Sequence, residues 1–278
     1  VLFEIGTDDL PAHILTDVLA QLETLAPAQF DDLRLENEGV SVMGTPRRLV
    51  IHAKNVATSQ PDVEELVKGP PAARAFDADG NPTKAAQGFA RSKGIDPSAL
   101  EVREIDGGEY VAAMVRTEGR ATGTVLAEAL PELIAAIKFG KSMRWNSTGI
   151  SFSRPLRWIV ALYDRMVIPF SFAGVPSGGV TRGIRPYGSP DLVLGNVETY
   201  FSTMVAQGVY LDMAERQAEI LKQVKALADE VGGTIPDDPG LLDEVTNLVE
   251  RPTSLRGEFE EKYLVLPREV LVSVMRKH

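Results

Sequence analysis

The sequence contains no cysteine and only three histidines among its 278 residues. The absence of cysteine excludes a disulfide framework, a thiolate metal site and a cysteine nucleophile. His13, His52 and His278 are too few and too scattered for most zinc or triad chemistry that depends on histidine. No apolar run approaches the roughly 18 residues of a membrane-spanning helix, so no such segment is predicted.

Motifs that bind nucleotides or activate a serine are also missing. The sequence has no phosphate loop of the G-x-x-x-x-G-K-[ST] type, no G-x-G-x-x-G after a strand and no G-x-S-x-G. Residues 77–81 begin like a calcium loop, but Pro82 and Gly88 stand where that loop needs glycine and glutamate, so a turn is predicted. Independent catalysis would rest on His13, His52 and dispersed carboxylates, so no catalytic or metal-binding residue is assigned.

Acidic side chains outnumber basic ones by 39 to 29, which gives a net charge of −10. Nucleic-acid binding is driven by Lys and Arg that neutralise phosphates, so this average argues against a nucleic-acid partner. The apolar content of 44% and the charged content of 24% are typical of a globular protein. The length favours about two domains.

Hydrophobic periodicity predicts an α+β fold of mixed and antiparallel sheets with packed helices, followed by a mainly helical C-terminal part. We place the α+β region in residues 1–190 and the helical region in residues 191–278. Asp8 or Asp9 is expected to cap the first helix. The other predicted elements are hairpins over 102–116 and 157–172, and helices over 83–93, 124–137 and 212–231, the last with Asp212 as its N-cap.

Both ends of the chain suggest a piece of a longer protein. The first residue is Val1 rather than Met, and Pro267 opens a helical apolar pattern that continues almost to the last residue. A helix rarely ends within one turn of its last apolar pair without a cap or glycine. We therefore expect the C-terminal segment to be truncated.

One segment departs from the acidic average. Residues 138–187 carry eight basic side chains and a single acidic one, a net charge of +7, whereas the other 228 residues have a net charge of −17. Six of the eight are arginines, which bind phosphate oxygens bidentately, and both tryptophans lie here, where aromatic faces can stack on unpaired bases. The eight residues of this basic segment are Lys138, Lys141, Arg144, Arg154, Arg157, Arg165, Arg182 and Arg185.

Two interpretations of the basic segment stay open. Its cations and aromatics face RNA or a partner protein, or the aromatics form a hairpin core while the arginines pair with carboxylates elsewhere. The glycine-rich run 177–185 allows close approach of backbone N–H groups to an anion, and it suits a sharp chain reversal equally.

Eight short motifs follow one another along the chain: FEIGTDDLP (3–11), TPRRL (45–49), KAAQGFA (84–90), KSMRW (141–145), FSRPLRW (152–158), SG followed by TRG (177–183), LLDEVT (241–246) and LPREVL (266–271). Together they resemble the N-terminal part of the β subunit of bacterial glycyl-tRNA synthetase, a family that includes chains with α and β fused. The family usually has His and Phe where this chain has Ile184 and Pro186.

The resemblance implies a non-catalytic part of a cytoplasmic, heterotetrameric glycine–tRNA ligase with no membrane contact. Glycine and ATP (with Mg) would bind in the α subunit, and no cofactor would bind this chain. The implied partners are the α subunit or α region, the remainder of β and tRNA(Gly), and the implied architecture is similar to the editing module of the phenylalanyl-tRNA synthetase β chain. An alternative is a scaffold that docks the α subunit or the rest of β without touching tRNA. Candidate tRNA-binding residues are Lys141, Arg144, Arg154, Arg157, Arg182 and Arg185, with Arg47 and Arg48 as secondary candidates.

Overall fold

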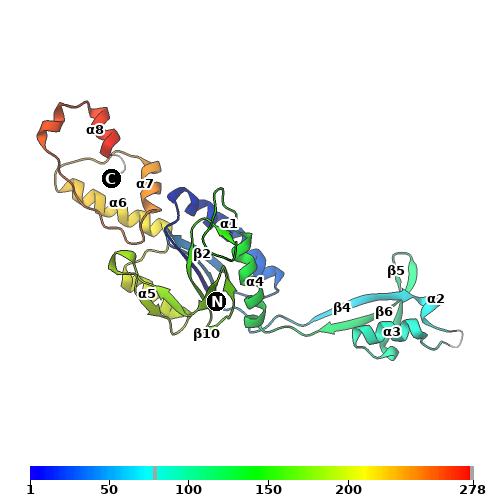
Figure 1. Ribbon diagram of the computed structural model, residues 1–278. Coiled ribbons are helices and arrows are strands. Elements are labelled where there is room, and N and C mark those ends of the chain that lie inside the picture. Colours follow the sequence, from blue (N-terminus) through cyan, green and yellow to red (C-terminus); the bar gives the residue numbers. More distant parts are fainter. Residues whose placement is uncertain (78–79, 276–278) are drawn as a thin grey trace. The chain divides into compact units, whose positions relative to one another are not determined.

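The computed structural model describes residues 1–77 and 80–275 and divides the chain into two compact units (Figure 1). The first unit combines Val1–Ala57 with Gly123–His278, and the second unit, Thr58–Thr122, is inserted between them. The turn predicted over residues 77–81 includes 78 and 79, and the expected truncated end includes 276–278. Those positions lie outside the described residues.

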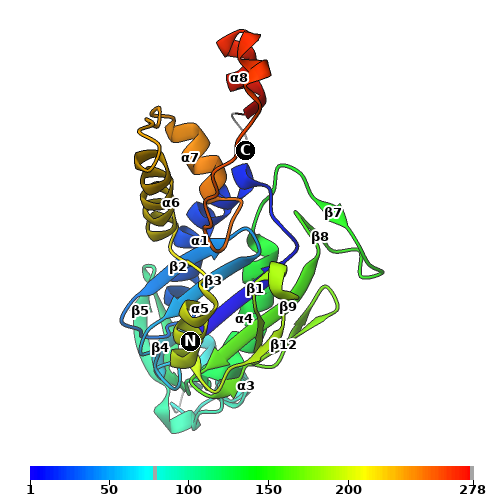
Figure 2. The same cartoon turned by 90° about the vertical axis from the view of Figure 1, so that its left-hand side faces the viewer.

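A mixed sheet forms the centre of the first unit (Figure 2). Strand β1 (Leu2–Thr7) lies between β3 (Arg48–Ala53) and β9 (Leu156–Tyr163) and is antiparallel to both. Strand β12 (Val175–Gly178) is parallel to β9, which makes the sheet mixed. The remaining strands are β2 (Val40–Thr45) beside β3, β10 (Met166–Val167) beside β9, and β11 (Ser171–Phe172) beside β12.

Helices cover both faces of this sheet. Alternation along the strands sends successive side chains to opposite faces, so β1, β3 and β9 each contribute apolar residues to two cores. On one face these residues pack against α1 (Ala12–Asp32) and α4 (Thr122–Ala136). On the other face they pack against Tyr200 and Met204 of α5 (Val197–Gln207). Burial on both faces explains why all six residues of β1 are inaccessible.

The predicted cap of the first helix is wrong. Helix α1 begins after Pro11, and no side chain caps its N-terminus. The carboxylate of Asp8 instead accepts hydrogen bonds from Arg157, and that of Asp9 accepts one from Arg185. Distant guanidiniums therefore outcompete the local backbone N–H groups for these two carboxylates.

The C-terminal part is helical, as predicted. It contains α6 (Met213–Asp229), α7 (Pro239–Thr246), the short 3-10 helix η3 (Glu261–Val265) and α8 (Arg268–Met275). Asp212 caps α6 as expected, because its Oδ1 accepts the Glu215 N–H at 2.9 Å. Strands β13 (Val180–Arg182) and β14 (Asp191–Val193) pair across residue 190, and both sides of that position lie in the first unit. A separate helical region from residue 191 stays a prediction.

The second unit is a three-stranded antiparallel sheet, β4 (Val63–Pro71), β6 (Gly108–Thr117) and β5 (Glu101–Ile105), with α3 (Lys84–Lys93) packed on one face. The predicted hairpin over 102–116 is confirmed, and Asp106 and Gly107 turn it with φ values of 55° and 76°. Helix α2 (Ala72–Ala75) and the 3-10 turn η1 (Pro97–Ala99) complete this unit.

The second predicted hairpin, over 157–172, is shorter than expected. Met166–Val167 pair with β9 and the Ile168 N–H donates to the Ala161 carbonyl at 2.9 Å, but Ser171–Phe172 pair with β12 instead. Within the described residues, no helix is both long enough and apolar enough to cross a membrane.

Candidate nucleic-acid interface

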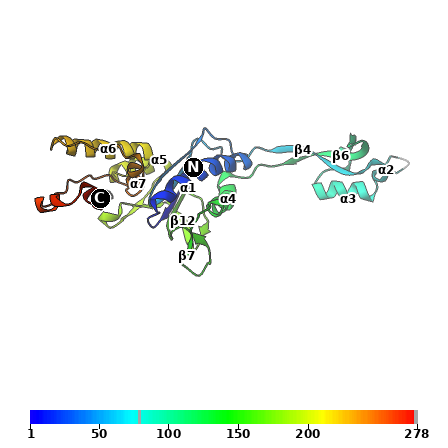
Figure 3. The same ribbon diagram turned by 90° about the horizontal axis from the view of Figure 1, so that it is seen from above.

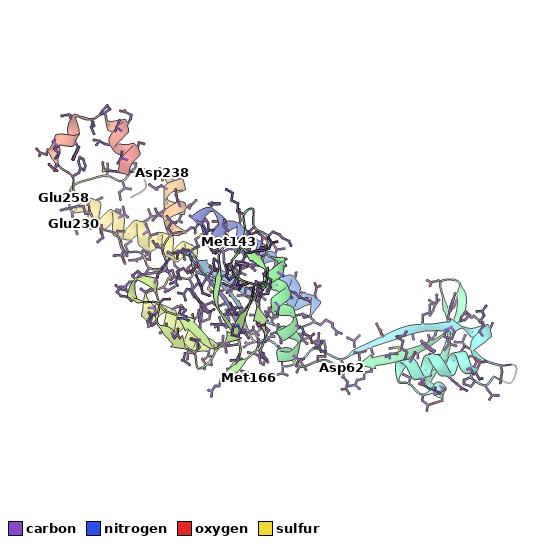
Figure 4. All side chains as sticks on the ribbon, viewed as in Figure 1. Asp62, Met143, Met166, Glu230, Asp238 and Glu258 are labelled. Carbon is purple, nitrogen blue, oxygen red and sulfur yellow. The ribbon has the colours of Figure 1, made fainter. Side chains whose placement is uncertain are left out.

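The first part of the basic segment forms a small hairpin that projects from the central sheet (Figures 2 and 3). Strand β7 (Met143–Arg144) pairs with β8 (Ser151–Phe152), and Met143 at its start is labelled in Figure 4. Phe152 anchors the base of the hairpin, because it is buried and its ring centroid lies 4.4 Å from that of Phe139. The cations between 141 and 154 are therefore carried on a loop with an apolar anchor.

Three of the predicted site residues on this loop bind no carboxylate. Arg144 Nε donates to the Gly149 carbonyl at 2.8 Å, and Arg154 Nη1 donates to the Ser153 carbonyl at 3.0 Å. Lys141 is exposed. Among the residues that the structure describes, none of these three cations has a carboxylate in ion-pair contact, so their charges are available to an external anion.

Three other predicted residues are already paired. Arg157 donates two hydrogen bonds to Asp8, at 2.9 and 2.6 Å, and these bonds raise the pKa of Arg157 and lower that of Asp8. Arg182 lies 2.5 Å from Asp191, and Arg185 pairs with Asp9. The interpretation in which arginines pair with distant carboxylates therefore holds for this half of the candidates. All three pairs are largely exposed, so an anion can compete for them at small cost.

Most aromatic side chains of the basic segment belong to the core. Phe152, Trp158 and Phe172 are buried, and Tyr163 donates its hydroxyl hydrogen to the Val56 carbonyl. Tyr187 differs from them, because 68% of it is exposed. Phe139, Trp145 and Phe170 are half-buried against the same core. Tyr187 is therefore the one described aromatic residue of this segment whose side chain is mostly exposed.

The secondary candidate Arg48 lies completely inside the first unit. Its Nε donates to Glu250 Oε1 at 2.6 Å, and its Nη1 donates to Glu4 Oε1 at 3.2 Å and to the Arg182 carbonyl at 2.9 Å. The indole N–H of Trp158 and the hydroxyl of Thr181 also donate to Glu4, at 3.1 and 2.7 Å. Arg48 thus joins β1, β3, β13 and residue 250, and its guanidinium has no exposed surface to offer RNA.

Burial and pairing act in opposite directions on this network. Burial raises the pKa of Glu4, and the neighbouring Arg48, Thr181 and Trp158 reduce that rise without cancelling it. Burial also acts to raise the pKa of Glu250, but Arg48, Thr45 and Arg47 outweigh it and hold that pKa below its ordinary range. The charged form of Glu250 is therefore the one that the fold stabilises.

Sequence reasoning missed this network for identifiable reasons. A signal for Glu4 existed, because a single carboxylate in the apolar strand β1 must find a buried partner. Arg48 directly precedes the buried run of β3 and carried the same signal. Glu250 carried none, because it lies 202 residues away from Arg48 along the chain.

The other secondary candidate, Arg47, lies at the edge of the network and is 9% exposed. Its guanidinium carbon is 5.6 Å from the centroid of the Trp158 ring, and Nη2 donates to Ser189 Oγ at 3.3 Å. Within the described residues, no group of three or more His, Asp or Glu side chains is arranged to hold a metal ion.

The chain is similar in sequence to one family model and to several curated proteins. The family model described as "Glycyl-tRNA synthetase beta subunit" matches residues 1–278. The "Glycine--tRNA ligase beta subunit" of Desulforamulus reducens is 45% identical over 277 residues, which cover 100% of this chain and 40% of the relative. The protein of the same name from Trichlorobacter lovleyi is 43% identical over 278 residues, again 40% of its length.

A plant protein gives a similar match. The "Glycine--tRNA ligase, chloroplastic/mitochondrial 2" of Arabidopsis thaliana is 44% identical over 278 residues, which are 26% of its length. The chain thus spans about 40% of the length of the bacterial relatives it matches. The resemblance carried by the eight motifs is confirmed, and the chain belongs to the glycyl-tRNA synthetase beta subunit family.

Proposed function

We propose that this chain is a non-catalytic part of a glycine–tRNA ligase that binds tRNA(Gly) and helps to assemble the enzyme. The observation that carries the proposal is the group Lys141, Arg144 and Arg154, three cations on and directly beside the projecting β7–β8 hairpin without a carboxylate partner among the described residues. Several other exposed arginines of this acidic protein do form ion pairs, as Arg157 does with Asp8. A positive loop on a negative molecule suits the phosphate backbone of an RNA.

The chemistry of the complete ligase is part of the same proposal. Glycine and ATP, with Mg, would bind in an α subunit or α region, as the family resemblance implies, and the sequence of this chain has no phosphate loop. The remainder of β and the α subunit would be its protein partners in a heterotetramer. The cytoplasm, where aminoacyl-tRNA is consumed, would be its location.

The test is a double charge reversal, Arg144→Glu with Arg154→Glu, in the full-length protein. We expect weaker binding of tRNA(Gly) and a dependence on salt that is flatter by about two units of slope, one for each lost phosphate contact. The matched control is Arg103→Glu with Arg256→Glu, since both arginines are exposed, both pair with carboxylates and the net charge changes equally. Unchanged affinity and slope in the first variant would refute tRNA binding by this loop.

A scaffold role is the second candidate, and a separate surface favours it. The segment 255–275 exposes large apolar side chains, including Leu255 at 85% and Val265 at 86%. Exposed apolar surface of this kind marks sites of protein–protein contact. Native mass spectrometry of the Arg144→Glu, Arg154→Glu variant separates the two roles. Loss of assembly with unchanged tRNA affinity in preformed complexes would make scaffolding the function of the basic segment.

A further inference from the structure

A pocket of about 390 Å³ lies beside the buried network of Arg48. Its walls come from Asp9 after β1, Arg47 in the turn between β2 and β3, the 3-10 turn η2 (Arg185–Tyr187) and residues 248–253. All these segments belong to the first unit. The volume lies in the range of roughly 300–1,000 Å³ that small-molecule sites occupy.

The pocket carries an excess of positive charge. Three guanidiniums line it, those of Arg47, Arg185 and Arg251, against the carboxylates of Asp9 and Glu250. Glu250 is already engaged, because Arg48 Nε and the Thr45 hydroxyl donate to its Oε1 at 2.6 and 2.7 Å. Arg185 pairs with Asp9, but both side chains are at least half exposed, so an incoming anion can compete for Arg185 at small cost, and Arg251 adds a further positive charge.

Two of the three guanidinium nitrogens of the buried Arg47 lack a hydrogen-bond acceptor. No described residue accepts a hydrogen bond from its Nε or Nη1. The carboxylates of Asp9 and Glu250 lie 3.7 and 4.0 Å from these atoms, beyond hydrogen-bond distance. Burial lowers the pKa of Arg47, and Arg48 and Arg185 contribute in the same direction. Unsatisfied buried N–H groups cost free energy, and an anion in the pocket would supply both the acceptors and the charge.

The lining of the pocket includes an exposed aromatic ring. Tyr187 is 68% exposed, and the guanidinium carbon of Arg251 lies 5.9 Å from the centroid of its ring. Pro186 and Leu248 add apolar surface to the lining. Aromatic rings and guanidinium planes are the surfaces on which unpaired nucleobases stack.

We propose that this pocket binds one unpaired nucleotide of an RNA. The phosphate accepts hydrogen bonds from Arg47 and Arg185, and the base stacks on Tyr187 beside Arg251. A carboxylate from a protein partner would satisfy the arginines but would leave the ring of Tyr187 without a stacking partner. The inference rests on the proposed function, tRNA binding, and adds a second contact point distinct from Arg144 and Arg154.

The experiment titrates the 278-residue chain with 5′-AMP, adenosine and inorganic phosphate in an isothermal calorimeter. We expect 5′-AMP to bind more tightly than either of its parts. Tyr187→Ala should weaken 5′-AMP binding by about 5- to 150-fold, the range for loss of one base stack, and leave phosphate binding unchanged. Arg185→Gln should weaken 5′-AMP and phosphate binding together. The matched control is Tyr263→Ala, which removes an exposed ring beside Lys262 that does not line the pocket.

The outcomes separate the pocket from the proposed function. Two results would overturn the proposal that the pocket binds a nucleotide. One is absence of 5′-AMP binding at millimolar concentration, and the other is 5′-AMP binding that Tyr187→Ala and Arg185→Gln leave unchanged. Neither result would contradict tRNA binding through Arg144 and Arg154. Equal affinity for phosphate and 5′-AMP also overturns the proposal for the pocket, because the base then makes no contact. Binding of 5′-AMP by a full-length protein that fails to bind tRNA overturns the proposed function and the RNA source of the ligand. Tryptophan fluorescence confirms that each variant is folded.

Discussion

Replacing Glu250 with glutamine should destabilise the first unit far more than removing an exposed ion pair. The Glu250 carboxylate accepts hydrogen bonds from the Thr45 hydroxyl at 2.7 Å and from Arg48 Nε and Nη2 at 2.6 and 3.2 Å. Glutamine keeps the shape and removes the charge. Arg48, with no exposed surface, would then retain only Glu4 as a counter-ion in hydrogen-bond contact.

The expected magnitude follows from burial. Removing one partner of a buried ion pair costs about 3–5 kcal/mol, because the remaining charge stays desolvated. The pair of Arg157 and Asp8 provides the comparison, with 56% and 37% of the two side chains exposed. Exposed pairs contribute about 0–1 kcal/mol. We therefore expect Glu250→Gln to lower the free energy of unfolding by at least about 3 kcal/mol, and Arg157→Gln by less than about 1 kcal/mol.

Urea unfolding followed by tryptophan fluorescence measures this difference. Both tryptophans, Trp145 and Trp158, lie in the first unit, so the signal does not report the inserted unit. The guanidinium carbon of Arg48 lies 5.5 Å from the Trp158 ring, which makes that ring a direct reporter of the network. A loss for Glu250→Gln no larger than that for Arg157→Gln would refute the reasoning.

The same carboxylate predicts a dependence on pH. The pKa of Glu250 in the fold lies below its ordinary value of 4.5. A carboxylate with a depressed pKa contributes stability that is complete above its unfolded pKa and is lost as the pH falls through its folded pKa. Wild-type protein should therefore lose stability below about pH 4.5 more steeply than Glu250→Gln. Equal slopes for the two proteins would contradict the assignment of Glu250 as the charged partner of Arg48.

Three further predictions concern stability. Asp212→Ala removes the N-cap of α6 and should cost about 1 kcal/mol, read from urea unfolding, whereas no loss would mean that the cap is unimportant. Gly6→Ala should cost about 1–3 kcal/mol, because the new Cβ would lie 2.0 Å from the Trp158 ring, while Gly123→Ala, with open space around it, should be neutral or stabilising. Burial, aided by the N-terminal amine and Lys54, lowers the pKa of His52, so stability should fall as the pH drops below 6.5, and His52→Gln should reduce that dependence in thermal melts.

Local chemistry made part of the fold predictable. The turn Asp106–Gly107 requires two residues with positive φ, and Asp-Gly supplies them, so the hairpin was predictable from a few residues. Asp212 stands before an amphipathic helix and makes no ion pair with an arginine among the residues that the structure describes, and its cap formed as expected. Asp8 had the same local pattern, but Arg157, 149 residues away, claims its carboxylate. Local sequence preferences for turns and helix caps therefore determine the structure where long-range contacts do not compete for the same side chains.

The boundaries of the two units depend on pairing between strands that lie far apart in the sequence. Strand β1 pairs with β9 from the other side of the inserted unit, so residues 1–57 and 123–278 form one unit. Hydrophobic periodicity identifies strands but does not show which strands pair with each other. The insertion of one unit into the other could therefore not be predicted from the sequence. For the same reason, periodicity could not predict that β13 and β14, which lie on either side of residue 190, pair with each other.

Composition pointed to a candidate stretch of sequence but could not show which of its cations lack a carboxylate partner. The net charge of +7 in residues 138–187 singled out this stretch as the candidate. Composition does not state which cation meets a carboxylate in space, and Arg157, Arg182 and Arg185 meet Asp8, Asp191 and Asp9. Three of the six primary candidates are therefore neutralised locally, and Lys141, Arg144 and Arg154 carry the unpaired charge.

The salt dependence of tRNA(Gly) binding tests this central claim most directly. Neutralising the three unpaired cations together, Lys141→Gln, Arg144→Gln and Arg154→Gln, should flatten the plot of log affinity against log salt by about three units of slope. The matched control neutralises Arg103, Arg116 and Arg256, which are exposed and paired with carboxylates, and should leave the slope nearly unchanged. A slope that is the same for both triple variants and the wild type would contradict tRNA binding by Lys141, Arg144 and Arg154 at the β7–β8 hairpin.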